Sequence, residues 1–281
     1  MPDAVPAELA DALRATRARR GRLGHPLYYV HETTSSNDLA AAYAERGAPE
    51  GTTVVAAAQT AGRGRLGRSW CSPPGAGLYV SVIIRDPRWA PWLTLAAGVA
   101  VTEGIRAATG LPLEIKWPND VVTPGTSGPS RRRKLAGVLA EGSSSSEGLQ
   151  HVILGFGINI SPASYPPDLA DRASSVETEL GCAVEPWVVL AEVLAALAAE
   201  LDALGGGDAS ALLARWRQLA PSAIGAAVEC DRGASRGLAV GHVEDRIEFG
   251  DVLDESVVLL DPRVEERVEA RCDRCWPRLR R

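Results

Sequence analysis

The sequence Gln59-Thr-Ala-Gly-Arg-Gly-Arg-Leu-Gly-Arg-Ser-Trp70 interleaves glycines with arginines more densely than any other part of the chain. Glycine lacks a Cβ, so its backbone can turn sharply or come close to a ligand. Arginine presents a planar fork of donors that suits phosphate and carboxylate groups. The segment therefore predicts a flexible, cationic loop that folds around an anion.

The glycines of this segment, Gly62, Gly64 and Gly67, also form the pattern G-x-G-x-x-G of dinucleotide-binding domains. That fingerprint requires a strand before it and a helix after it, with the helix N-terminus facing the pyrophosphate. A strand is predicted over 52–58, but the residues after Trp70 are Cys-Ser-Pro-Pro-Gly, which cannot begin a helix. A dinucleotide site is therefore rejected, and a solvated surface turn is the remaining alternative to an anion-binding loop.

The composition is that of an ordinary soluble protein with one large domain or two unequal ones. The 281 residues are 46% hydrophobic and 23% charged, which is enough for a sizeable core. The net charge of −5 argues against a nucleic-acid partner, because such proteins usually carry a basic face. Neither a membrane span nor a signal peptide is predicted. We therefore expect a cytoplasmic monomer or homodimer without a nucleic-acid or membrane partner.

The five cysteines are scattered and odd in number, so a secreted disulfide framework is not expected. Cys272 and Cys275 form a single C-x-x-C near the C-terminus. Zinc sites of this kind need a second pair or nearby histidines. We therefore do not expect a metal ion there.

Lysine is rare in this chain. Lys116 and Lys134 are its only lysines, and arginine supplies the other basic side chains. These two positions therefore point to sites that need a compact ammonium group, with biased composition as the alternative. Lys116 opens the string Lys-Trp-Pro-Asn-Asp120, and Lys134 lies in Arg133-Lys-Leu-Ala-Gly137.

Hydrophobic periodicity predicts a mixture of strands and helices as far as residue 219. Strands are predicted over 27–31, 52–58, 77–85, 113–117, 134–141 and 151–160, and helices over 7–19, 38–46, 91–109, 187–204 and 209–219. A Gly/Ser-rich connector is expected over 123–132, and a polar turn over 142–148. The composition changes near residue 220, so we expect three parts: 1–24, 25–220 and 221–281.

Polar side chains stand where several of these elements begin or end. Thr33-Thr-Ser-Ser-Asn37 precedes a helix, and it contains more hydroxyl and amide groups than an N-cap needs. Asn119 and Asp120 follow a strand that Pro118 ends, where side chains often converge on a pocket. Asn159 ends a strand whose alternating glycines indicate the close approach of a backbone or ligand. A satisfied turn amide is the alternative for Asn159.

Taken in order, these motifs resemble those of biotin protein ligases (biotin–[acetyl-CoA-carboxylase] ligases). The resemblance covers roughly residues 27–220, and its most specific strings are GRGR-x-GR-x-W and KWPND. It implies an α+β fold with a mixed sheet flanked by helices, related to class II aminoacyl-tRNA synthetases, and a small C-terminal SH3-like β-barrel. Residues 220–225 resemble the start of that barrel, but the family's glycine-punctuated strands are not recognisable after them.

The resemblance also implies a two-step reaction. Biotin and ATP with Mg²⁺ give biotinyl-5′-AMP, and a lysine of a biotin carboxyl carrier protein then attacks this anhydride. The expected catalytic residues are Lys134, Arg65 and Asp120. The expected biotin-binding residues are Ser35, Ser36, Asn37, Gln59, Gly62, Arg63, Gly64, Arg65 and Lys134. The expected ATP-binding residues are Arg63, Arg65, Arg68, Trp70, Lys116, Asn119 and Asn159, of which Asn159 is also the candidate metal ligand.

Three other functions remain as alternatives. A lipoate–protein ligase uses a similar adenylate, although the KWPND string favours biotin. A bifunctional ligase that also represses transcription is disfavoured, because the N-terminal part is too short for a DNA-binding domain. A catalytically impaired biotin or nucleotide binder is the third alternative, although Lys134 and the arginines are retained.

Overall fold

The computed structural model describes residues 2–125, 132–146 and 148–223, and the backbone of 227–232, 235–239 and 257–260. The chain divides into two compact units, Met1–Leu219 and Ala220–Arg281. Most of the connector predicted over 123–132 lies outside the described residues, as do Cys272 and Cys275.

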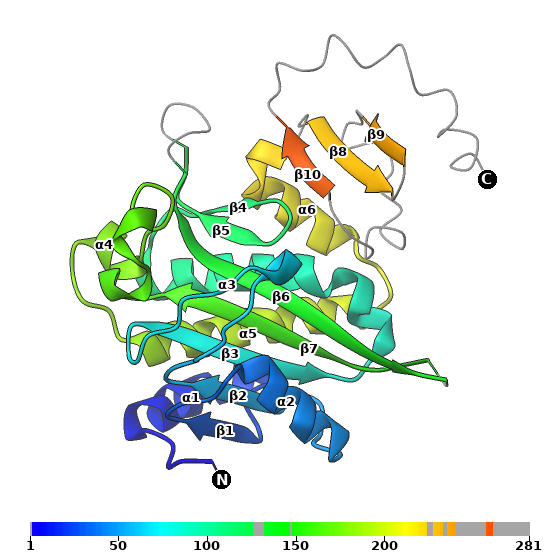
Figure 1. Cartoon of the computed structure of the whole chain (residues 1–281). Coiled ribbons are helices and arrows are strands. Elements are labelled where there is room, and N and C mark those ends of the chain that lie inside the picture. Colours follow the sequence, from blue (N-terminus) through cyan, green and yellow to red (C-terminus); the bar gives the residue numbers. More distant parts are fainter. Residues whose placement is uncertain are drawn as a thin grey trace. The chain divides into compact units, whose positions relative to one another are not determined.

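The first unit is built on a seven-stranded mixed sheet (Figure 1). Its strands, in spatial order, are β1 (Leu27–Val30), β2 (Thr53–Ala56), β3 (Gly77–Ile84), β7 (Gly148–Asn159), β6 (Lys134–Ser145), β5 (Asp120–Val122) and β4 (Glu114–Lys116). Its helices are α1 (Ala7–Arg20), α2 (Ser36–Glu45), α3 (Leu93–Thr109), α4 (Val176–Leu180), α5 (Pro186–Leu204) and α6 (Ser210–Leu219). The strands β1 and β2 are parallel and are joined through α2, whereas all other neighbouring pairs are antiparallel.

The two faces of this sheet are covered differently. Helices α3 and α5 lie against one face, and α1 packs on α5 (Figure 1). Alternate strand residues such as Val80, Val82 and Leu154 point into the apolar core on that side. On the other face, Ala40 and Ala44 of α2 cover only part of the sheet. The rest of this face is available to the Arg/Gly loop.

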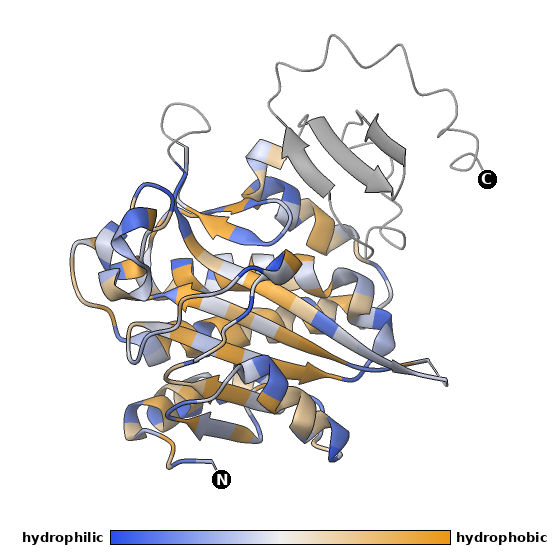
Figure 2. Cartoon of the chain, viewed as in Figure 1, coloured by the Kyte–Doolittle hydropathy of each residue, from blue (hydrophilic) through white to orange (hydrophobic). Residues whose placement is uncertain are grey.

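Apolar residues, orange in Figure 2, follow the strands and the inward sides of the helices. This distribution is the expected one for a sheet that is buried on one face and partly covered on the other. Within the described part of the chain, no helix is both long enough and apolar enough to cross a membrane.

The helix boundaries follow local signals in the sequence. Helix α3 ends at Gly110, whose φ of 75° is left-handed and whose N–H donates to the Arg106 carbonyl at 2.7 Å. Helix α5 begins at Pro186, and the carboxylate of Glu185 accepts the Trp187 N–H at 3.3 Å.

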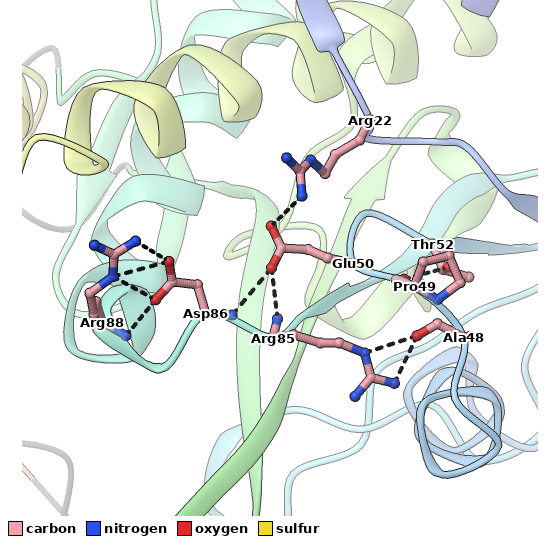
Figure 3. A network of polar contacts seen from close by, with 8 residues as sticks. All are labelled: Arg22, Ala48, Pro49, Glu50, Thr52, Arg85, Asp86 and Arg88. Carbon is pink, nitrogen blue, oxygen red and sulfur yellow. Dashed lines mark hydrogen bonds and ion pairs between the residues drawn. The ribbon is translucent and has the colours of Figure 1, made fainter.

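A network of polar contacts fixes the connection between α2 and β2 (Figure 3). The Glu50 carboxylate accepts the backbone N–H groups of Arg85 and Asp86, each at 3.2 Å, and Arg22 lies 3.8 Å away. The Arg85 guanidinium donates to the Ala48 carbonyl at 2.7 and 2.9 Å. These contacts attach the C-terminal end of α2 to the end of β3, so they are structural.

The mixed sheet flanked by helices agrees with the predicted fold of the first unit. The predicted turn over 142–148 is wrong in its extent, because β6 continues to Ser145 and β7 begins at Gly148. The backbone of an antiparallel ribbon can stay paired even where its side chains are polar, so the serines remain in the strand. Strand β5 was not predicted, because three residues are too few to show a period.

The second unit contains a separate antiparallel sheet among its described segments. Its strands lie in the order β10 (Val257–Leu260), β8 (Ala227–Arg232) and β9 (Ser235–Ala239).

Two glycines of α3 give a matched test of helix packing. A Cβ on Gly104 would lie 2.5 Å from the Cα of Val193 in α5, whereas a Cβ on Gly98 would come no closer than 3.6 Å to Ile115. Overpacking of this kind costs about 1–3 kcal/mol, more than the roughly 1 kcal/mol that alanine gains over glycine in a helix. We expect Gly104→Ala to lower the melting temperature, and Gly98→Ala to leave it unchanged or raise it. Thermal denaturation of both variants measures this, and an unaltered Gly104→Ala protein would contradict the close approach of the helices.

Candidate active site

Glycines on two neighbouring strands form a floor on the open face of the sheet. Gly157 of β7 pairs with Gly137 of β6. A Cβ on Gly157 would lie 2.5 Å from Cε2 of Trp70, and one on Gly137 would lie 3.1 Å from its Cζ3. A Cβ on Gly155 would overlap the side-chain oxygen of Asn37. The alternating glycines therefore make room for two side chains of the chain itself.

The Arg/Gly loop crosses this floor as a narrow hairpin in front of β6 and β7 (Figure 1). The Trp70 N–H donates to the Gly62 carbonyl at 2.8 Å, and the Gly64 N–H donates to the Arg68 carbonyl at 2.7 Å. Its tip is a single 3₁₀ turn, with Leu66 in the left-handed region at φ 57°. The next element is strand β3, so no helix follows the glycines.

Carboxylates of the chain act as counter-ions for Arg63, which differs from the expectation that an anion must fold the loop. The Arg63 guanidinium donates to Asp38 at 2.7 Å and to Glu141 at 3.0 Å. The hydrogen bond that Arg63 donates to Glu141 is the largest cause of the raised Arg63 pKa, and the one that it donates to Asp38 adds to it. These contacts attach the first turn of the loop to α2 and β6.

A chain of buried or half-buried polar groups continues from this point. The Oδ1 of Asn37 accepts the Ser81 hydroxyl at 2.5 Å. The Ser36 hydroxyl lies 2.8 Å from the same Ser81 hydroxyl. The Ser36 N–H donates to Oε1 of Gln59 at 2.8 Å, and Nε2 of Gln59 donates to Ser72 at 2.8 Å. Residues from α2, β3 and both ends of the loop therefore belong to one hydrogen-bonded set.

Ser35 is the N-cap residue of α2 by position, and it is buried, but its side chain makes no capping hydrogen bond. The helix begins at Ser36 rather than at the predicted residue 38. Both serines and Asn37 are thus held at the start of a helix, where backbone N–H groups favour a polar or anionic ligand.

A second cluster gathers around Lys134. Its Nζ lies 2.6 Å from Oδ1 of Asp120 and 5.0 Å from the centre of the Trp70 ring. Burial lowers the pKa of the Arg65 guanidinium, and the charge of Asp120 raises it in part. The Asp120 carboxylate therefore pairs with Lys134 beside the indole ring, and its charge also acts on Arg65.

The backbone of Lys134 is held on more than one side. Its N–H donates to the Arg172 carbonyl at 2.8 Å, and its carbonyl accepts the Ser174 N–H at 2.9 Å. The side-chain amide of Asn159 donates to the Ser174 carbonyl at 2.9 Å and to the Lys134 carbonyl at 3.4 Å. The ammonium group thus extends from a fixed point of the backbone.

The remaining predicted site residues are less closely grouped. The Asn119 side chain donates to the Val138 carbonyl at 2.8 Å, and the backbone carbonyl of Asn119 accepts the Val138 N–H at 2.9 Å. Asn119 therefore fastens the β4–β5 turn to β6. Lys116 and Arg68 are exposed, at the end of β4 and on the loop hairpin.

Four residues whose side chains belong to these networks were not predicted from the sequence: Glu141, Asp38, Ser81 and Ser72. Ser81 had a signal, because it is the one polar residue within Leu-Tyr-Val-Ser-Val-Ile-Ile84 apart from the tyrosine. Glu141 shares the alternation of Gly137 on β6, which places both on the site face. That alternation becomes informative only when the facing elements are known.

The donor groups of the site favour a magnesium ion that arrives with phosphate groups over a metal held by the protein alone. The described segments contain no group of three or more His, Cys, Asp or Glu side chains that could hold a metal. Magnesium in nucleotide sites is typically held by one or two carboxylates together with substrate phosphates, and Asp120 supplies one carboxylate. The amide nitrogen of Asn159 is already committed to two carbonyl groups.

Comparison with known proteins gives a consistent assignment. Residues 29–159 match the biotin/lipoate A/B protein ligase family. The chain is 38% identical over 177 residues to the bifunctional ligase/repressor BirA of Bacillus spizizenii, which covers 61% of this chain and 52% of that protein. It is 36% identical over 164 residues to the biotin--[acetyl-CoA-carboxylase] ligase of Paracoccus denitrificans, which covers 54% of this chain and 65% of that protein.

The fold also matches a solved structure, the biotin protein ligase from Aquifex aeolicus in complex with biotin and ATP. The TM-score is 0.61 at 29% identity, with 76% of this chain and 87% of that chain covered. The chain spans about half the length of the BirA relatives that it matches.

Proposed function

We propose that the chain is an ATP-dependent biotin protein ligase, because residues 29–159 match the biotin/lipoate A/B protein ligase family. It activates biotin as biotinyl-5′-AMP and transfers the biotinyl group to a lysine of a biotin carboxyl carrier protein. The relatives and the similar structure support this proposal through their own names and ligands.

One observation carries the proposal: the Lys134 ammonium lies between Asp120 and the Trp70 ring, at the edge of a glycine floor. Joining a carboxylate to the α-phosphate of ATP brings two anions together, and fixed cations reduce their repulsion as the bond forms. The ammonium of Lys134 is the compact charge between them. Arg65 reaches the same place from the loop, and the Trp70 ring excludes water from one side.

The residues of the first network complete the biotin side of this proposal. Ser35, Ser36 and Asn37 at the start of α2, and Gln59 at the start of the loop, offer the donors and acceptors that a ureido ring needs. Gly62 and Gly64 let the hairpin close over the ligand, because a Cβ on Gly62 would lie 2.6 Å from the Trp70 carbonyl.

We assign ATP to the side of the site that holds the exposed cations. Arg68 and Lys116 are free to approach phosphates from solvent, and Trp70 offers a ring face to the adenylate. Asn119 and Asn159 border this side through their backbone contacts. Magnesium, when bound with ATP, would neutralise phosphate charge, and Asn159 is our candidate contact for it.

The Lys134–Asp120 ion pair leads to a prediction about the second step. The anions of the substrates compete with Asp120 for Lys134, which releases the carboxylate to orient or deprotonate the acceptor amine. We expect Asp120→Ala to keep biotinyl-adenylate formation within a few-fold of wild type. Transfer to the carrier should slow by about 10²-fold, the usual contribution of a positioned general base.

Single-turnover assays separate the two steps. Pyrophosphate release reports adenylation, and mass spectrometry of the carrier reports transfer. Equal losses in both steps would show that Asp120 acts only by holding Lys134. Asp120→Asn, which keeps the shape without the charge, should transfer slowly in the same way.

The choice between biotin and lipoate is tested directly. The protein is incubated with ATP, Mg²⁺ and either vitamin, and the adenylate is identified by mass. We expect biotinyl-AMP and little lipoyl-AMP. An excess of lipoyl-AMP would identify the chain as a lipoate–protein ligase. The absence of both adenylates would identify it as a catalytically impaired binder.

We propose further that residues 221–281 form the small SH3-like barrel that the resemblance implies, after a catalytic domain over 25–220 and an N-terminal helical extension over 1–24. The antiparallel order β10-β8-β9 supports this. Measured on the whole chain, amide hydrogen exchange should then be slow in all three strands.

We also propose a cytoplasmic monomer or homodimer whose partner is the carrier protein, with neither nucleic acid nor membrane bound.

A further inference from the structure

The carboxylate of Glu141 lies between two motifs that the proposed function assigns to biotin. One of its oxygens accepts the Nδ2 of Asn37 at 2.5 Å, and the same oxygen accepts the Arg63 guanidinium at 3.0 Å. Asn37 comes from α2 and Arg63 from the loop, so Glu141 joins two elements that are far apart in the sequence. Its own strand, β6, also begins with Lys134.

The contact with Asn37 fixes the orientation of an amide group. An amide has one donor end and one acceptor end, and a hydroxyl partner can match either end. The Oδ1 of Asn37 accepts the hydroxyl of Ser81, and this hydroxyl could equally accept a hydrogen bond from the amide nitrogen. A carboxylate only accepts, so Glu141 alone dictates that the Nδ2 end faces β6. Because Asn37 is buried above Gly155, the chain has little room for another arrangement.

The contact with Arg63 changes the role expected for that arginine. Its charge is shared between Glu141 and Asp38, so it is less available to a phosphate than Arg65 or Arg68. Arg63 therefore ties the hairpin down over the start of α2.

We propose that Glu141 is a positioning residue for biotin recognition, which it performs by fixing the orientation of the Asn37 amide. This inference rests on the proposed function. Glu141 touches neither ATP nor the reacting atoms in this proposal. Its loss should therefore weaken the binding of biotin far more than it weakens the binding of ATP or slows the chemical step.

Steady-state pyrophosphate release on the full chain tests this. We expect Glu141→Ala to raise the KM for biotin by about tenfold or more, with the KM for ATP and kcat within about twofold, because about 1.4 kcal/mol of binding corresponds to tenfold. Glu141→Gln keeps one accepting oxygen and should lie between alanine and wild type. Asp38→Ala is the matched control, since the Asp38 side chain pairs with Arg63 but makes none of the described hydrogen bonds to the Asn37 side chain. It should change the biotin KM by less than twofold.

The outcomes are distinct. A wild-type chain that makes no biotinyl-AMP would overturn the proposed function itself. An active wild type with an unchanged biotin KM in Glu141→Ala would overturn the role of Glu141 alone. Equal rises of the two KM values, or an Asp38→Ala variant as impaired as Glu141→Ala, would also overturn it. If Glu141→Ala does not fold, the Glu141→Gln variant decides through the same ratio of KM values.

Discussion

Lys134→Ala is expected to slow biotinyl-adenylate formation by about 10²-fold or more, the scale seen when a group that stabilises transition-state charge is removed. The Lys134 ammonium lies 2.6 Å from the Asp120 carboxylate, and the backbone of Lys134 is held by Arg172 and Ser174. Water can solvate the two anions in the variant, but it must reorganise as the bond forms, whereas a fixed charge need not.

The fold of this variant should persist. The side chains of Lys134 and Asp120 are 33% and 25% exposed, so the carboxylate left behind can still reach water. The backbone contacts of residue 134 with Arg172 and Ser174 do not depend on its side chain. We therefore expect nearly unchanged circular dichroism and melting temperature beside the large loss of rate.

Two further variants make this prediction specific. Lys134→Arg restores the charge, but it replaces a compact ammonium by a planar fork whose donors lie at other positions. We expect it to remain at least about tenfold slower than wild type, a change of about 1.4 kcal/mol. Arg88→Ala removes an exposed cation from the network in Figure 3 and should be fully active. If the Lys134→Ala protein forms the adenylate at a near wild-type rate, the catalytic role proposed for Lys134 is wrong.

Gly157→Ala is expected to produce the second large effect. The new Cβ would lie 2.5 Å from Cε2 and 2.6 Å from Nε1 of Trp70, which no real side chain tolerates. The indole ring must therefore move, and the loop hairpin that carries it must move too. Lys134 then loses the contact between its ammonium and this ring. A shift of about 1 Å in a catalytic group can cost about 10²-fold in rate. We therefore expect adenylation to fall by about that factor.

Stability should fall less than activity in Gly157→Ala. Overpacking a well-packed site costs about 1–3 kcal/mol, and the Trp70 ring is half-buried and can move towards solvent. Gly142→Ala is the matched control on the neighbouring strand, since its Cβ would meet only the flexible end of Leu149 at 3.2 Å. It should keep both activity and stability.

A double-mutant cycle identifies Trp70 as the intermediary. Trp70→Leu removes the ring that the new methyl group would displace, so adding Gly157→Ala to it should cause little further loss. The two changes would then be strongly non-additive, as expected for residues in contact. Additive losses, or an active Gly157→Ala enzyme, would show that the position of the Trp70 ring does not depend on a glycine at residue 157.

The local sequence was sufficient for many parts of this protein. Pro118 and Gly110 end their elements as their backbone chemistry requires, and the apolar runs of β3 and β7 predict buried strands. The same reasoning misjudged residues 142–148, because the pairing of a ribbon is not visible in one strand. It also treated the Arg/Gly loop as a segment in need of an anion, because it had no means to locate Asp38 and Glu141 beside Arg63.

The sequence by itself determined the types of element, the mixed α+β fold of the first unit and the kinds of chemical group that the site contains. Only the tertiary structure decided which of these groups meet. Arg63 and Glu141 are 78 residues apart in the chain yet form an ion pair, and Trp70 covers glycines from two other strands. Hydrogen bonds and close packing act over a few ångströms, whereas local propensities act along neighbouring residues. The partners of each charge are therefore fixed by how the strands and helices come together.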